Sequence, residues 1–116
     1  MKKSGQIVLF RFPQTNLMRG QLRPALLLEK LPGSYDDWLI CMISSQMRHY
    51  MAGLDEIIDK NAPDFLDSGL KEASIIRVGR LAVVEGFMLL GSIGEIYKER
   101  LMRIKSNLAA WLTNNS

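Results

Sequence analysis

Few side chains of this 116-residue chain have types that suit catalysis. Cys41 is the only cysteine and His49 the only histidine, so these two residues could form a nucleophile and base pair. A cysteine inside an apolar segment is more often a small buried hydrophobe, which makes this pair a minor alternative. The same counts exclude an intramolecular disulfide and leave no good set of zinc ligands. We therefore expect neither a metal nor another cofactor.

Common catalytic motifs are missing from the sequence. There is no GxSxG nucleophile turn, no Walker loop, no GxGxxG at the start of a helix and no HExxH. The familiar hydrolases and nucleotide-binding enzymes that carry these motifs are therefore excluded.

Charge is unevenly distributed along the chain, although the net charge is only +3. Residues 1–30 carry six basic and one acidic side chain, residues 31–72 carry three and eight, and residues 73–116 carry six and three. If the two basic segments meet in space, they form a surface that attracts polyanions while the acidic middle faces elsewhere. The alternative is a set of charges spread over a solvated surface.

Three segments of the N-terminal half have the composition of β-strands. Residues 5–12 (GQIVLFRF), 22–29 (LRPALLLE) and 38–46 (WLICMISSQ) are rich in apolar, β-branched and aromatic residues. The polar residues 14–21 predict an exposed loop, and the Pro-Gly pair and two aspartates of residues 30–37 predict a turn.

The C-terminal half predicts further short strands and one helix. Residues 54–58, 73–78, 81–84 and 86–91 suit closely spaced strands of a small curled sheet, and residues 62–68 suit a helical turn or a loop. An apolar stripe at alternating spacings of four and three then predicts an amphipathic helix that packs on the sheet. The stripe consists of Tyr97, Leu101, Ile104, Leu108 and Trp111.

These segments predict one mainly β domain over residues 1–116, a small antiparallel barrel with a C-terminal helix. No apolar run reaches the roughly 20 residues that a membrane-spanning helix needs. The apolar stretch after Lys2 and Lys3 is interrupted by Arg11 before it is long enough for a signal peptide. We expect a cytoplasmic protein.

The order of these segments resembles a known family. GQIVLFRFP is followed by a polar loop, LRPALLL, a strand ending in ISSQ, then SGL, ASIIRVGRL and the closing helix. This order is similar to the MazF/PemK (Kid-like) toxins of bacterial toxin–antitoxin pairs, and the likeness covers nearly the whole chain. The resemblance implies a homodimer of SH3-like barrels that cleaves single-stranded RNA at short sequences without a metal and is silenced by a cognate antitoxin.

The resemblance also implies two catalytic positions. The arginine of the family's Arg-Pro pair matches Arg23, and its hydroxyl residue at the end of the next strand matches Ser44, where threonine is usual. Attack by a ribose 2′-OH passes through a phosphorane with extra negative charge, which a fixed guanidinium and a hydroxyl donor stabilise. Because its pKa lies above about 12, Arg23 suits charge stabilisation better than proton abstraction. The alternative is a strand-edge arginine that is either solvated or paired with Glu29.

One position departs from the family pattern. An arginine of the family is followed two residues later by an acidic general base, but here Arg77 is followed by Gly79. Arg77 could still contact the phosphate and Arg80 could supply a cation, but neither replaces a base. His49 is the obvious substitute, because its unperturbed pKa is near neutrality. A surface histidine is the plainer interpretation, and Asp36 and Asp37 are minor candidates with a simpler role in the turn.

Binding of RNA would depend on basic and polar residues around this site. The residues we assign to RNA binding are Arg11, Arg19, Arg80 and Gln46. The resemblance further implies an acidic, partly disordered antitoxin segment as partner, which suits the basic segments of the chain. Because the expected acid is missing, the competing hypothesis is a non-catalytic module on the same fold, either a gyrase poison or an RNA binder without cleavage.

Overall fold

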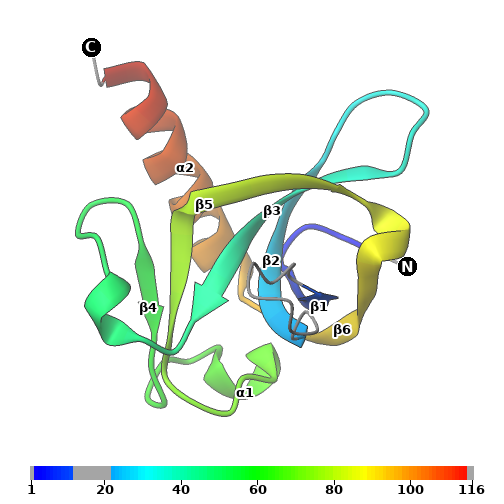
Figure 1. Ribbon diagram of the computed structural model, residues 1–116. Coiled ribbons are helices and arrows are strands. Elements are labelled where there is room, and N and C mark those ends of the chain that lie inside the picture. Colours follow the sequence, from blue (N-terminus) through cyan, green and yellow to red (C-terminus); the bar gives the residue numbers. More distant parts are fainter. Residues whose placement is uncertain (1, 12–21, 115–116) are drawn as a thin grey trace, which may run out of the picture.

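The computed structural model describes residues 2–11 and 22–114, which form a six-stranded antiparallel sheet and a long C-terminal helix. The strand order is β4-β5-β3-β2-β1-β6, and Figure 1 shows the sheet curling until β6 lies beside β1. The predicted mainly β fold with a C-terminal helix is confirmed. The elements are β1 (Gln6–Arg11), β2 (Leu22–Lys30), β3 (Asp37–Ser44), η1 (Met47–His49), β4 (Glu56–Ile58), α1 (Phe65–Ser68), β5 (Ser74–Glu85), η2 (Gly86–Met88), β6 (Leu89–Glu95) and α2 (Lys98–Asn114).

The third strand is shorter than the sequence predicts. We expected it to continue to Gln46, but β3 ends at Ser44 and the chain turns at once into η1. The turn is stabilised by the Ser44 hydroxyl, whose Oγ accepts a hydrogen bond from the Gln46 N–H at 3.0 Å. Serine favours such local bonds to the backbone, which compete with continued strand pairing.

The prediction of two separate strands over residues 73–84 is wrong. A single strand, β5, runs from Ser74 to Glu85 and pairs with β3 along most of its length. Between the two apolar runs there is only an irregularity in the pairing with β3, and the strand continues through it. The expected strand over residues 86–91 is wrong for its first half, because η2 occupies residues 86–88. Residues 89–91 do form a strand, as the start of β6 at the far edge of the sheet.

Two apolar cores cover the two faces of the sheet. The helix-side core packs against α2 and consists of Ile7, Leu26, Leu28, Cys41, Ile43, Leu54, Ile58, Phe65, Ile76, Val78, Ile96, Leu101, Ile104 and Leu108. The inner core lies on the face around which the sheet curls and consists of Val8, Phe10, Ala25, Leu27, Trp38, Ile40, Val84 and Leu89. Alternate residues of each strand enter different cores, as the two-residue period of a strand requires.

The C-terminal helix buries only the middle of the predicted stripe. Leu101, Ile104 and Leu108 are buried, whereas Tyr97 and Trp111 are exposed. Tyr97 precedes the helix, which begins at Lys98, and in Figure 1 the C-terminal end of α2 extends beyond the sheet. Neither helix among the described residues combines the length and the apolar character needed to cross a membrane.

Candidate active site

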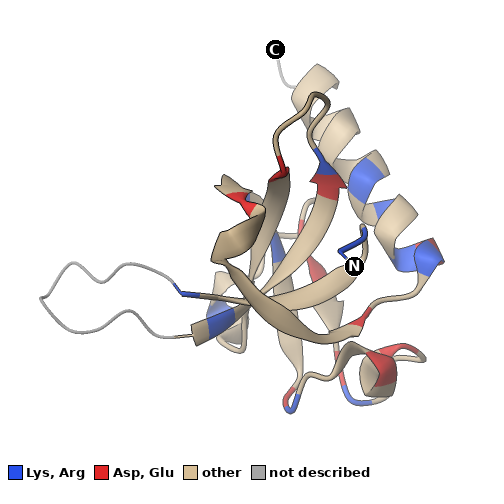
Figure 2. Ribbon diagram, turned by 90° about the vertical axis from the view of Figure 1, so that its right-hand side faces the viewer, with Lys and Arg blue, Asp and Glu red and all other residues tan. Residues whose placement is uncertain are grey.

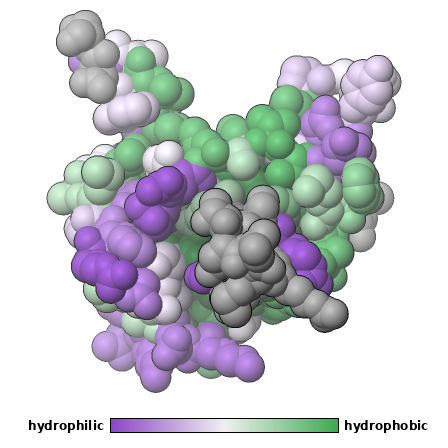
Figure 3. All heavy atoms as spheres, viewed as in Figure 1, coloured by the Kyte–Doolittle hydropathy of each residue, from purple (hydrophilic) through white to green (hydrophobic). Residues whose placement is uncertain are grey.

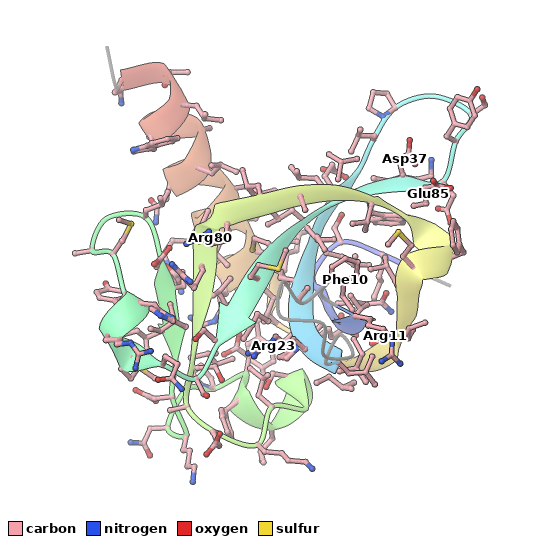
Figure 4. The ribbon with its side chains drawn as sticks, viewed as in Figure 1. Phe10, Arg11, Arg23, Asp37, Arg80 and Glu85 are labelled. Carbon is pink, nitrogen blue, oxygen red and sulfur yellow. The ribbon has the colours of Figure 1, made fainter. Side chains whose placement is uncertain are left out.

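Strand pairing brings Arg23 and Ser44 together. β2 and β3 pair antiparallel from Lys30 opposite Trp38 to Ala25 opposite Met42, and Arg23 and Ser44 each lie two residues beyond this last pair. Both residues, with Gln46, line one cleft of about 200 Å³, and Figure 4 shows Arg23 where β2 approaches α1. The two positions thus share one open site.

His49 lies against the Ser44 hydroxyl. The η1 turn folds the chain back over the end of β3, with the His49 N–H donating to the Gln46 carbonyl at 3.0 Å. This turn places His49 Nδ1 3.2 Å from Ser44 Oγ. The hydroxyl therefore has hydrogen-bond contacts to both an imidazole and the Gln46 N–H, and such contacts orient its oxygen.

The surroundings of His49 favour its neutral form. Desolvation lowers the pKa of His49 below its ordinary value, and the positive charges of Arg77, Arg48 and Arg80 lower it further. The imidazole is therefore predominantly uncharged at neutral pH, which is the state that a general base needs. The influence of three arginines also places a strong positive potential beside Ser44.

A second cleft lies beside the first and contains a carboxylate. Its volume is about 250 Å³, and its walls are formed by Met51, Asp55, Arg77, Gly79 and Arg80. Asp55 is only 7% exposed. Its Oδ1 accepts the Val78 N–H at 3.0 Å and its Oδ2 accepts the Met51 N–H at 2.9 Å. Sequence reasoning missed Asp55, because only the folding of the loop before β4 brings it to β5.

A family model confirms the resemblance on which this site was predicted. The model for the PemK-like, MazF-like toxins of type II toxin–antitoxin systems matches residues 3–112. The chain belongs to this family. Comparison with curated proteins found no sequence with significant similarity to this MazF-like toxin.

Two solved structures show the same fold. A Mycobacterium tuberculosis toxin, MazF-mt6, superposes with a TM-score of 0.66 at 13% identity, over 92% of this chain and 95% of the other. An endoribonuclease in complex with its cognate antitoxin, from a mycobacterial species, gives a TM-score of 0.65 at 11% identity, over 97% and 95% of the two chains. At such low identity the likeness supports the fold of the MazF-like chain and says nothing of individual residues.

The remaining predicted residues of this MazF-like toxin lie at different distances from the site. Gln46 lines the first cleft and accepts a hydrogen bond from Arg48 at 2.9 Å. Arg80 lies in the second cleft, whereas Arg11 lies on the β6 side of the sheet (Figure 4). Arg19 lies outside the described residues. Sequence reasoning missed three polar residues near the start of β5 that also line the first cleft, namely Lys71, Glu72 and Ser74.

Two minor candidates have structural roles instead. Cys41 is fully buried in the helix-side core, and burial raises the pKa of its thiol, which keeps it protonated and excludes a nucleophilic pair with His49. Asp36 accepts a hydrogen bond from Trp38 Nε1 at 2.8 Å in the turn before β3. Figure 4 shows the neighbouring Asp37 at the opposite end of the sheet from Arg23.

The distribution of charge corrects one expectation. The acidic middle segment does not face away from the C-terminal basic segment, because Arg100 pairs with Glu56 and Asp64, and Arg103 pairs with Glu56. Figure 2 shows the basic residues that α2 contributes to this side of the molecule. The pairings offset the positive charges of Arg100 and Arg103, whereas Arg23, Arg77 and Arg80 of the MazF-like toxin line the two clefts. Glu29 pairs with Lys105.

Proposed function

We propose that this protein is a metal-independent endoribonuclease that cleaves single-stranded RNA by attack of a ribose 2′-OH on the adjacent phosphate. One observation carries the proposal: Arg23 and Ser44 line the same cleft, and Ser44 contacts an imidazole of lowered pKa. A fixed cation, a hydroxyl donor and a neutral base are the groups that this reaction needs when no metal takes part.

Each group has a defined role in the proposed reaction. With the proton of the neutral ring on Nδ1, His49 donates to Ser44 Oγ, and Nε2 accepts the proton of the attacking 2′-OH. The Ser44 hydroxyl, which already accepts the Gln46 N–H, directs its own proton to a phosphoryl oxygen. Arg23 binds the oxygens that gain charge in the phosphorane. The bond from phosphorus to O5′ then breaks and O5′ takes a proton from solvent, which leaves a 2′,3′-cyclic phosphate and a 5′-OH.

The rest of the RNA would follow the positive potential around the site. Arg77 and Arg80 line the second cleft, next to His49, and Gln46 lines the first. Guanidinium groups bind backbone phosphates regardless of base, while an amide such as that of Gln46 can distinguish base edges. Arg11 and Arg19 remain predicted RNA-binding residues further from this centre.

Two protein partners belong to the proposal. A cognate antitoxin with an acidic segment would cover the arginines of the clefts and exclude RNA. A second copy of the chain would cover exposed apolar side chains, and Figure 3 shows hydrophobic residues gathered across β5 and β3 between α2 and the β2–β3 turn. Leu81, Val83 and Leu112 are 40%, 54% and 62% exposed, and exposed apolar side chains that form a contiguous patch are typical of an interaction site.

The proposed chemistry predicts defined RNA ends. Purified protein incubated with a long single-stranded RNA in excess EDTA should produce fragments with 2′,3′-cyclic phosphate and 5′-OH ends, because the nucleophile is the RNA's own 2′-OH. End-labelling and mass spectrometry identify the ends. The matched control is the same RNA with a 2′-deoxy nucleotide at the cleaved site, which should stay intact there. Intact RNA together with gyrase inhibition, or binding of RNA without cleavage, would refute the endoribonuclease and support the non-catalytic module.

A base of lowered pKa predicts a particular pH profile. The cleavage rate should rise with pH in acid solution and level off before neutrality, because His49 is active when deprotonated and its pKa is below the ordinary value. Replacing His49 with glutamine should remove this acid limb and lower the rate by roughly 10²–10⁴-fold. Single-turnover rates from pH 4 to 9 measure both effects. An unchanged acid limb in the variant would contradict the assignment and point to Glu72, the carboxylate of the same cleft.

A further inference from the structure

Strand β5 carries Arg77 and Arg80, and at one point its backbone pairs with neither of the strands beside it, β3 and β4. On β3, the consecutive residues Cys41 and Met42 pair with Leu81 and Arg77 of β5, so residues 78–80 of β5 have no counterpart on β3. On the other side, the pairing with β4 ends where Glu56 lies opposite Ile76. The backbone groups of this bulge therefore need partners from outside the two ladders.

Asp55 supplies one of these partners. Asp55 directly precedes β4, and its side chain, rather than its backbone, bonds to β5 here, because Oδ1 accepts the Val78 N–H at 3.0 Å. Its other oxygen accepts the Met51 N–H at 2.9 Å, which ties the bulge to the loop that follows η1. The carboxylate is 7% exposed, so the two bonds are screened little by water.

The bulge has a direct effect on the two arginines. Arg77 and Arg80 are three residues apart, and in a regular strand residues at an odd separation point to opposite faces of the sheet. Here both line the same cleft as Asp55, and both of their charges act on His49. The extra residues of the bulge turn the chain so that the two side chains reach the same side.

We propose that Asp55 is a positioning residue of this site, whose carboxylate holds the bulge at residues 78–80 in the shape that presents Arg77 and Arg80 to His49 and to bound phosphate. The catalytic part of this inference rests on the proposed endoribonuclease function. Asp55 is not assigned as the base, because both of its oxygens already accept backbone N–H groups.

The only histidine provides a direct readout. In the Asp55→Asn variant the amide cannot accept both N–H groups, so the bulge should relax and the guanidinium groups should move away from His49. The His49 pKa, followed by the C2–H proton in NMR titration, should then rise. Loss of the Asp55 negative charge alone would lower that pKa, so the sign of the shift separates a positioning effect from a simple charge effect. Asp59→Asn, at an exposed position of the next loop, makes the same charge change and should leave the pKa unaltered.

Kinetics give a second readout for a folded variant. We expect Asp55→Asn to lower kcat on the order of 10²-fold with little change in KM, because displaced groups act mainly on the transition state. A folded variant whose His49 pKa is unchanged or lower would overturn the proposal. The titration decides this even if the wild-type protein leaves RNA intact, so the two proposals can fail separately.

Two further variants test the geometry without touching the buried carboxylate. Arg77→Met and Arg80→Met should each raise the His49 pKa in the otherwise intact chain, because each removes a positive charge that faces the ring. If Asp55→Asn does not fold, these two variants still test whether Arg77 and Arg80 are presented to His49. If neither variant moves the titration of His49, the arginines are not presented to it and the proposal is wrong.

Discussion

Replacing Arg23 with methionine should reduce RNA cleavage by roughly 10³-fold while the protein stays folded, because removal of one preorganised charge donor from a transition state typically costs 10²–10³ or more in rate. Methionine keeps much of the side-chain volume and removes the charge. Arg23 lies at the exposed end of β2 and lines the first cleft, so its loss should leave both cores intact. Single-turnover cleavage at saturating protein, with circular dichroism as the check of folding, measures the effect.

Two companion variants separate the possible causes of that loss. Arg23→Lys keeps the charge but cannot form the paired hydrogen bonds of a guanidinium to two phosphate oxygens, so its activity should lie between those of wild type and Arg23→Met. Lys98→Met removes one positive charge at an exposed position of α2 and should cleave at the wild-type rate. Wild-type cleavage by Arg23→Met would contradict the assigned role, and an equal loss in Lys98→Met would indicate a general effect of net charge.

The parts of the site that the sequence predicts are those set by regular strand pairing. The segments around Arg23 and Ser44 have clear strand composition, and a turn joins them, so an antiparallel pair follows. That pair brings the two residues to the same end of neighbouring strands, where both line the first cleft. His49 was also a reasonable candidate, because a histidine five residues beyond the strand end can return to it through one turn, as η1 does.

The parts that the sequence did not predict depend on irregular structure. The two apolar runs of β5 look like two strands because the residues between them, Gly79 and Arg80, interrupt the apolar pattern. In the structure these residues belong to a bulge in one continuous strand. The role of Asp55 follows from that bulge and from the loop before β4, and neither has a local sequence signal. Side-chain bonds between distant segments are set by tertiary packing, which periodicity does not describe.

The sequence also does not predict which basic side chains are paired with acidic ones. Segment totals predict a basic N-terminus and a basic C-terminus, and they treat all arginines alike. Three arginines act on His49, however, whereas Arg100 and Arg103 of α2 are paired with acidic side chains from the middle of the chain. The two arginines of α2 therefore serve the fold, and the positive charge available to an anionic ligand comes from fewer residues than the composition indicates.

Replacing Arg100 with methionine should destabilise the protein by roughly 3–5 kcal/mol, because it leaves the buried Asp64 carboxylate without its cationic partner. Arg100 is 8% exposed and its guanidinium contacts both Asp64, at 2.8 Å, and Glu56, at 2.9 Å. It also donates to the Ile57 carbonyl at 3.1 Å. These bonds join α2 to β4 and to the residue before α1. Thermal unfolding should show a fall in Tm of roughly 10–20 °C for a domain of this size.

Arg103→Met is the matched control, because Arg103 lies on the same helix and pairs with the same Glu56 but its side chain is 52% exposed. An exposed pair contributes only about 0–1 kcal/mol. Equal losses in the two variants would contradict the importance of burial, and so would a stable Arg100→Met protein.

The pH dependence of stability provides a second check on Arg100. Burial by itself raises the pKa of Asp64, but the hydrogen bonds from Arg100 and from the Tyr97 N–H outweigh it and hold the pKa below its ordinary value. A carboxyl of lowered pKa stabilises the folded state above its unfolded pKa, and this contribution is lost as the pH falls through the lowered value. In Arg100→Met, by contrast, Asp64 has no cationic partner, so its protonation removes the cost of burying its charge and stabilises the folded state. The difference in unfolding free energy between the two proteins should therefore narrow below about pH 4, and a difference that is constant down to pH 2 would show that the carboxylate pairing is not its source.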